Sequence, residues 1–299
     1  MNRGHCAPTD EASAAGSSER AARSCISCAR EAALQALLCG DPAAKTSLTL
    51  ALRDDLRRGA VSIASERIVK APSATLPGRP ARPVLLPPQQ VPRRRLGSLE
   101  GRAALVHALA HIEFNAINLA LDIVWRFPNL PESFYRDWLN VAAEEALHFT
   151  FLLEHLRTLG YDYGDFPAHN GLWNMAEKTA DDLLARLALV PRTLEARGLD
   201  VNPGIRAKLA AAGDTSAAAI LDRILADEIG HVQIGNSWYR WACTQAGLDP
   251  IAAYAELTVR HQAPRLKAPF NHTARLQAGF TQSEIDWLEQ LSATVPPTP

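Results

Sequence analysis

The sequence lacks any run of about 18 or more consecutive apolar residues, the length that a transmembrane helix needs. Its first residues also lack the apolar core of a secretory signal. We therefore expect a cytoplasmic chain with no membrane partner. Cysteine is scarce, at five of 299 residues, and an odd number in a chain without a signal favours reduced thiols over a disulfide framework.

One cysteine pair, Cys25-x-x-Cys28, has a spacing that metal and redox sites also use. A zinc site needs a second ligand pair, and a redox site needs a strand that leads into a helix. The Ala-rich surroundings favour thiols that face a helix packing surface instead. The role of Cys25 and Cys28 stays open at this point.

An excess of either charge is also absent, because 31 Lys and Arg residues balance 32 Asp and Glu residues. This balance argues against a strongly basic nucleic-acid-binding protein. Hydrophobic residues make up 47% of the chain, which is enough to bury a core. The composition is that of an ordinary globular protein.

Changes in composition and the positions of proline and glycine divide the chain into five parts. Residues 1–24 are rich in Ser, Ala and charge and predict a mobile tail. Residues 25–71 contain two short helical patterns. Residues 72–97 hold seven prolines and predict an extended arm that ends in Arg93, Arg94 and Arg95. This arm either packs on the domain or contacts RNA or phosphate, and the neutral net charge favours packing.

Residues 98–247 carry four long helical patterns without a strand pattern between them. They run over about 99–127, 131–159, 172–197 and 216–246. Ser98 is the expected N-cap of the first, Gly198 and Gly247 are expected to end the third and fourth, and 199–215 is one of the longer connections. Long helices joined by short or moderate loops predict an all-α fold built on a four-helix bundle. Residues 248–299 predict a C-terminal extension with short helices, the last near 282–292.

The second and fourth helical patterns each contain a Glu-x-x-His pair. These pairs are Glu145 with His148 and Glu228 with His231, and a spacing of three residues puts both side chains on one helical face. Glu113 precedes the first pair by 32 residues, and Glu195 precedes the second by 33. The order Glu then Glu-x-x-His therefore occurs twice, as a pseudo-twofold bundle requires.

Apolar residues flank Glu113, Glu145 and Glu228 at the same-face positions, so these acids should face the core. Bare buried carboxylates are costly, and two divalent cations would compensate four of them. Oxygen and imidazole ligands suit iron, manganese or zinc. Glu195 is less certain from its neighbours, since Arg192 could pair with it at the surface, although a distortion at Pro191 could aim it inward.

Three further residues are candidates for supporting the ligands. Glu144 and Asp227 each lie four residues before the histidine of their own helix, so each is either the acceptor of a hydrogen bond from that histidine or a plain surface acid. Tyr239 follows His231 by eight residues and is either a proton or electron relay or an ordinary core tyrosine.

This pattern resembles the ferritin-like superfamily of di-iron and di-manganese carboxylate proteins. The strings AHIEFNAINLALDIVWRF, YRDWLNVAAEEALHF and DEIGHVQIGNSWYRW resemble, more narrowly, a bacterial ferritin-like family of unknown function. The nearest functional neighbour is the tRNA-modifying di-iron hydroxylase, which shares the six-ligand pattern. The resemblance implies that six residues bind two metal ions: Glu113, Glu145, His148, Glu195, Glu228 and His231.

The resemblance implies a non-haem dimetal oxidoreductase that uses O2 or peroxide to hydroxylate or oxidise a small organic substrate. Iron is the first expectation for both ions, with manganese or a mixed pair as alternatives, and a reductase would supply electrons. Two other functions stay open. One is metal handling, as a ferroxidase or peroxide-removing protein, and the other is a tRNA-associated or structural module. The substrate and the oligomeric state do not follow from the sequence.

Overall fold

The computed structural model describes residues 28–92 and 94–293, and in these residues the chain is all-helical, as the sequence predicts. The described residues contain no strand, only two isolated bridges between extended segments. The predicted tail over 1–24, together with Cys25 and Arg93, lies outside the described residues.

Two N-terminal helices cover one side of the central helices. α2 (Ala29–Leu38) packs against α4 (Leu99–Arg126), and α3 (Pro42–Arg57) packs against α5 (Glu132–Thr158). The side chain of Asp41 caps the first turn of α3, which explains why the helix begins there. Both helices correspond to the short helical patterns of the sequence.

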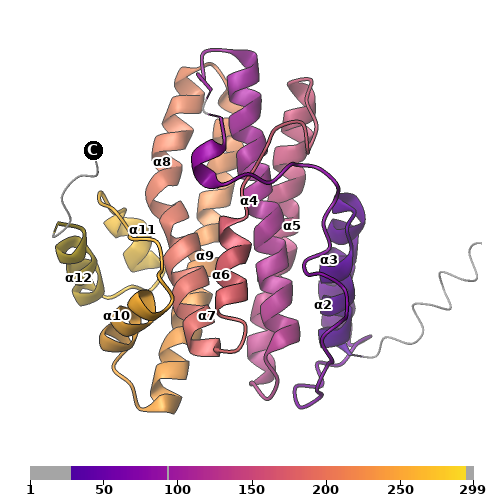
Figure 1. Cartoon of the computed structure of the whole chain (residues 1–299), viewed down its shortest axis with the longest axis vertical. Helices are drawn as coiled ribbons and strands as arrows, with labels where there is room; N and C mark the ends of the chain where they lie inside the picture. The colour runs from indigo at the N-terminus through magenta and orange to yellow at the C-terminus, as the bar shows by residue number, and fades with distance from the viewer. Residues whose placement is uncertain (1–27, 93, 294–299) are drawn as a thin grey trace, which may run out of the picture.

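The centre of the molecule consists of long helices that pack along one another (Figure 1). α9 (Thr215–Ala246) packs on α5 and on a composite helix made of α7 (Leu183–Leu189), η2 (Val190–Glu195) and α8 (Ala196–Ala211). α4 packs mainly along α5. The start of α4 and the end of α9 lie where the sequence predicts them. The Ser98 side chain caps the first turn of α4, and Gly247, with φ of 67°, ends α9.

The prediction of one helix over 172–197 is wrong in its bounds. α6 (Gly171–Lys178) is a separate short helix, and α7 begins after a break, where the Asp182 side chain accepts a hydrogen bond from the first turn. At its other end the composite helix continues through Gly198. A glycine inside a helix costs only about 1 kcal/mol, and burial of apolar residues against α9 can outweigh that cost.

Pro203 inside α8 is tolerated because its missing hydrogen bond is replaced. A proline cannot donate to the carbonyl four residues before it, which here belongs to Leu199. The side chain of Asn271 donates to that carbonyl at 3.1 Å. The helix therefore extends to Ala211, and the connection predicted over 199–215 shortens to the turn before α9.

The described residues of the Pro-rich arm, 72–92 and 94–97, are extended and irregular, apart from the 3-10 turn η1 (Pro88–Gln90). The arm follows the loop 160–170, where the Leu86 amide donates to the Ala168 carbonyl at 2.8 Å. The arm therefore packs on the domain over the part of it that the structure describes.

Arg94 shows how the basic end of the arm is held. Its Nε donates to Glu100 at 3.0 Å, and its guanidinium lies 4.9 Å from the ring centroid of Phe166. Both contacts are to the domain on which the arm lies. Arg94 is therefore part of the contact between the arm and the domain.

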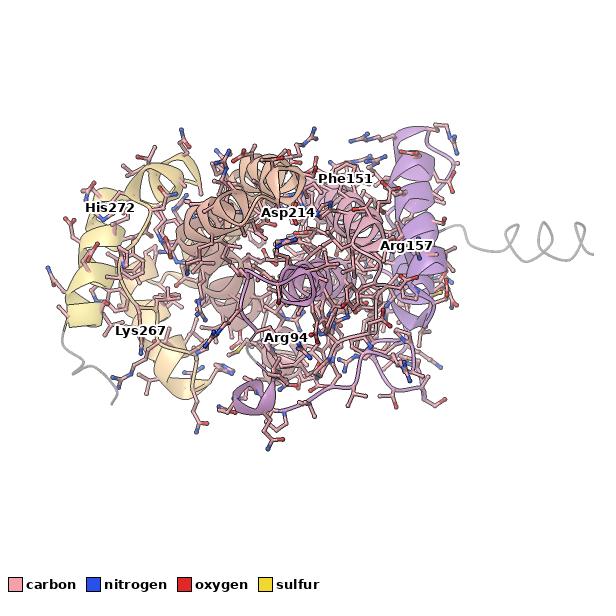
Figure 2. The ribbon with its side chains drawn as sticks, turned by 90° about the horizontal axis from the view of Figure 1, so that it is seen from above. Arg94, Phe151, Arg157, Asp214, Lys267 and His272 are labelled. Carbon is pink, nitrogen blue, oxygen red and sulfur yellow. The ribbon has the colours of Figure 1, made fainter. Side chains whose placement is uncertain are left out.

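Three C-terminal helices lie on the opposite side from α2 and α3, as the view from above shows (Figure 2). They are α10 (Pro250–Arg260), α11 (His272–Gln277) and α12 (Gln282–Ala293). α10 packs on α7 and α9, and α11 packs on α8 and α9. The long helices are therefore flanked on two sides by shorter ones.

Within the described ranges one helix, α4, is long and apolar enough to cross a membrane by length and composition alone. However, 72% of its most apolar stretch is buried inside the protein. That is the packing of a core helix, because a membrane span would present its apolar face to lipid.

A buried lysine joins α3 to α4. Lys45 has no exposed surface, and its Nζ donates to the backbone carbonyls of Leu37 and Gly78, at 3.2 Å and 3.0 Å. Its third hydrogen bond goes to the side-chain oxygen of Asn118 on α4. All three protons of the ammonium group are therefore used.

We expect Lys45→Met to lower the free energy of unfolding by about 1–3 kcal/mol, because it leaves buried acceptors without a donor. Chemical denaturation would measure the change. The matched control is Lys208→Met at an exposed position of α8, which should change the free energy by less than about 0.5 kcal/mol. Equal effects in the two variants would contradict the assigned role of Lys45.

A buried histidine makes part of the stability depend on pH. The Nε2 atom of His107 accepts a hydrogen bond from the Gly164 amide at 2.9 Å, and its ring stacks on Tyr163. Burial lowers the pKa of His107 from 6.5 to about 4. Between these values the unfolded chain binds a proton at this side chain and the folded chain does not.

The free energy of unfolding should therefore fall as pH is lowered from 6.5 towards 4. In His107→Gln the amide oxygen can still accept from Gly164, but the side chain does not titrate. We expect the variant to lose less stability over this range, measured by denaturation at several pH values. Parallel curves for the two proteins would show that His107 does not contribute.

Candidate metal centre

The predicted acids and histidines come together between the long helices. Glu113 comes from α4, Glu145 and His148 come from α5, and Glu228 and His231 come from α9. Glu113 and Glu145 are 5% and 0% exposed, and each histidine is 1% exposed. The apolar residues around them on each helix turn these polar side chains inward. Carboxylates and imidazoles are thus gathered in the interior.

Glu145 lies between the two histidines. Its Oε1 is 3.0 Å from Nδ1 of His231, and its Oε2 is 3.3 Å from Nδ1 of His148. The two imidazole centroids are 5.7 Å apart. Both histidines therefore present the same type of nitrogen to one central carboxylate, and Nδ1 is the atom that each would offer to a metal ion.

Glu113 and Glu228 lie beside the two histidines. Oε2 of Glu113 is 3.6 Å from Nδ1 of His148, and Oε1 of Glu228 is 3.6 Å from Nδ1 of His231. One donor atom from each of Glu113, Glu145, His148 and Glu228 lies within 4.8 Å of the others. This group of oxygen and nitrogen donors could hold a metal ion.

Glu195 ends the π-helical turn η2, so the local distortion expected at Pro191 is present. Its Oε2 is buried and has no hydrogen-bond partner in the described part of the chain. Burial raises the pKa of Glu195 well above its ordinary value, and the charges of Glu228 and Glu145 add to the shift. Glu195 therefore lies near the cluster, but outside the group of four residues whose donor atoms lie within 4.8 Å of one another.

Protons compensate the buried charges in the metal-free protein. Burial raises the pKa of Glu113 well above its ordinary value, and the charge of Glu145 raises it further. Burial opposes the charge on Glu145 too, but His231 and His148 outweigh it and hold the pKa of Glu145 well below its ordinary value. Although burial lowers the pKa of His148, Glu113 and Glu145 raise it to about 11. Metal ions binding here would displace such protons.

The outer acids contact histidines, but not those of their own helices. His148 Nε2 on α5 donates to Asp227 on α9 at 3.1 Å, and His231 Nε2 on α9 donates to Glu144 on α5 at 2.8 Å. The expectation that each acid serves the histidine four residues later is therefore wrong. The histidine rings point across the interface between the two helices, where the facing helix supplies the acceptor. Arg223 also pairs with Asp227, at 2.7 Å.

The structure shows the partners of Arg192 and Tyr239, which the sequence left open. Arg192 is buried and pairs with Glu284, at 2.7 Å, rather than with Glu195 at the surface. The hydroxyl of Tyr239 donates to the Pro250 carbonyl at 2.7 Å, which places it in the packing between α9 and α10. A relay role for Tyr239 stays a prediction.

Two residues that contact the turn carrying Glu195, Gly235 and Glu284, were missed by the sequence analysis. Gly235 on α9 faces Pro191, and a Cβ atom there would lie 2.5 Å from the Cβ of Pro191. A glycine inside a helical pattern is a signal for such a close approach. Glu284 had no comparable signal, since its partner lies 92 residues away.

Comparison with known proteins places the chain in a family. A family model described as "Protein of unknown function (DUF455)" matches residues 38–286, which include the whole cluster. An uncharacterized protein of Haemophilus influenzae (strain ATCC 51907 / DSM 11121 / KW20 / Rd) is 50% identical over 231 residues, covering 75% of this chain and 80% of that protein. No solved structure matches the chain. The chain therefore belongs to the DUF455 family.

Proposed function

We propose that the chain is a non-haem dimetal oxidoreductase of the ferritin-like superfamily. α4, α5, α9 and the composite helix α7–η2–α8 would be its four-helix bundle. The observation that carries the proposal is the buried cluster of carboxylates and histidines, in which Glu195 has an oxygen without a partner in the described part of the chain. Cations would offset the cost of burying these charges.

Six residues would hold the two ions: Glu113, Glu145, His148, Glu195, Glu228 and His231. Glu145 contacts both histidines, so it could serve both ions, and Glu228 beside His231 would be a further ligand that they share. The mixed oxygen and nitrogen donors suit iron, and manganese or a mixed pair would use the same ligands.

When bound, such a metal pair supplies the activation of O2 or peroxide that hydroxylates or oxidises an organic substrate. The chain itself orients the ligands and excludes water. Asp227 and Glu144 accept hydrogen bonds from the Nε2–H groups of the two histidines. These bonds keep the proton on Nε2 and leave Nδ1 free to bind a metal ion. The apolar faces of the helices shield the centre from solvent.

The other participants are part of this proposal. The substrate would be a small molecule, and an oxygenase of this kind would take electrons from a reductase in the cytoplasm. A role in nucleic-acid binding has less support, because Arg94 is already engaged with Glu100 and Phe166.

Metal analysis tests the ligand set. We expect the wild-type chain to bind two Fe(II) or Mn(II) ions after equilibrium dialysis. Glu145→Gln should bind fewer than one, because it removes the charge that both histidines contact. The matched control is Glu132→Gln at the start of the same helix, where the carboxylate pairs with Arg136 at the surface. Fewer than one ion in the wild type, with no change in Glu145→Gln, would end the dimetal proposal.

Oxygen consumption separates an oxidoreductase from a metal-handling protein. After anaerobic loading with Fe(II) and reduction, we expect the wild-type chain to consume O2 repeatedly when a reductant is supplied, and Glu145→Gln to be inactive. Iron storage instead requires a large hollow assembly and mineral formation. Size-exclusion chromatography that finds such an assembly would favour the metal-handling function.

A further inference from the structure

The π-helical turn η2 that carries Glu195 is held from outside its own helix. π-turns are rare and persist where the surrounding structure determines them. On one side, Gly235 of α9 lies so close to Pro191 that a Cβ atom would come within 2.5 Å and 2.9 Å of two ring carbons. Only a glycine lets α9 approach the turn this closely.

Arg192, the next residue of the turn, is fixed by two hydrogen bonds. Its two terminal nitrogens donate to Asn236 Oδ1 of α9 at 2.6 Å and to Glu284 Oε1 of α12 at 2.7 Å. The side chains of Arg192 and Glu284 are only 3% and 5% exposed. The guanidinium also lies over the aromatic rings of three residues: Tyr239, Tyr254 and Phe280. α9 and the C-terminal extension thus enclose Arg192 together.

Thr193 completes these contacts. Its hydroxyl donates to the Ala188 carbonyl at 2.8 Å and accepts from the Tyr254 hydroxyl of α10 at 2.8 Å. Three successive residues, 191–193, are therefore held by α9, α10 and α12, and Glu195 follows two residues later. The position of Glu195 depends on where this turn lies.

We infer that Glu284 and Gly235 are positioning residues for Glu195, and that α12 therefore acts on the metal centre without contacting it. The inference rests on the proposed function, in which Glu195 is one of six ligands. Because Glu195 lies outside the group of Glu113, Glu145, His148 and Glu228, it would be a ligand of the second ion. If the pair between Arg192 and Glu284 is lost, the turn can relax towards an ordinary α-helix. The Glu195 carboxylate then rotates away from the cluster, while Glu113, Glu145 and His148 keep their places on other helices.

A second buried ion pair provides a matched control. Arg275 of α11 pairs with Asp200 of α8 at 2.7 Å, with side chains 0% and 5% exposed. This pair also joins the C-terminal extension to the composite helix, but its ion pair is to α8. Asp200 has no printed contact with η2, whereas Arg275 also donates to the carbonyl of Ala196 just after η2, at 3.5 Å, so the control changes Asp200 and keeps Arg275. Asp200→Asn and Glu284→Gln each neutralise one buried carboxylate beside an arginine, so they should have similar costs in overall stability.

The test is a titration of the full-length chain with Mn(II) alone, followed by the EPR signal of the unbound ion. We expect wild type and Asp200→Asn to bind two ions per chain. In Glu284→Gln the first ion should bind as in the wild type, and the second should bind about 10- to 100-fold more weakly, the usual cost of losing an outer support. Gly235→Ala should have the same selective effect without changing α12.

Amide hydrogen exchange of the metal-free proteins gives an independent measurement. Residues 190–196 should exchange faster in Glu284→Gln than in Asp200→Asn.

Two ions bound at wild-type affinity in both Glu284→Gln and Gly235→Ala would overturn the inference and leave the proposed function standing. An equal loss of the second ion in Asp200→Asn would also overturn it. A wild-type chain that binds fewer than two ions would overturn the proposed function, and this inference with it.

Discussion

Carboxylates that point into a helical interior must be neutralised there, and this requirement organises the centre of the molecule. Glu145 has no exposed surface and contacts a histidine from each of two helices. Each histidine in turn donates to an acid on the facing helix, so α5 and α9 are joined by hydrogen bonds in both directions. Protons compensate the charge in the metal-free chain, and cations would do so in the same place.

Buried charges elsewhere in the described residues are compensated differently. Asp122 in α4 has no exposed surface, but it pairs with both Arg126 and Arg186. Arg30 is equally buried, and it donates to the carbonyls that end α4. In contrast, no Lys or Arg of the described residues forms an ion pair with the cluster carboxylates. Among the described residues, this excess of acid is what makes the cluster a candidate metal site and sets it apart from the structural ion pairs.

Cap residues predicted the helix ends correctly where no contact from a distant part of the chain affected them. Ser98 and Gly247 mark the ends of α4 and α9 because a cap is a property of adjacent residues. The same reasoning failed at Gly198, which was expected to end the third helix, and the helix continues through Pro203 as well. Both residues lie inside α8, since packing on α9 and a hydrogen bond from Asn271 compensate what each lacks.

The sequence by itself determined which side chains enter the centre, because the 3.6-residue period of a helix places Glu145 beside His148 whatever the rest of the chain does. Only the tertiary structure decided which acid each histidine contacts and which way the π-turn directs Glu195. Those features depend on how closely two helices approach, at Gly235 for example, and on partners as distant as Glu284. No periodicity within one helix contains that information.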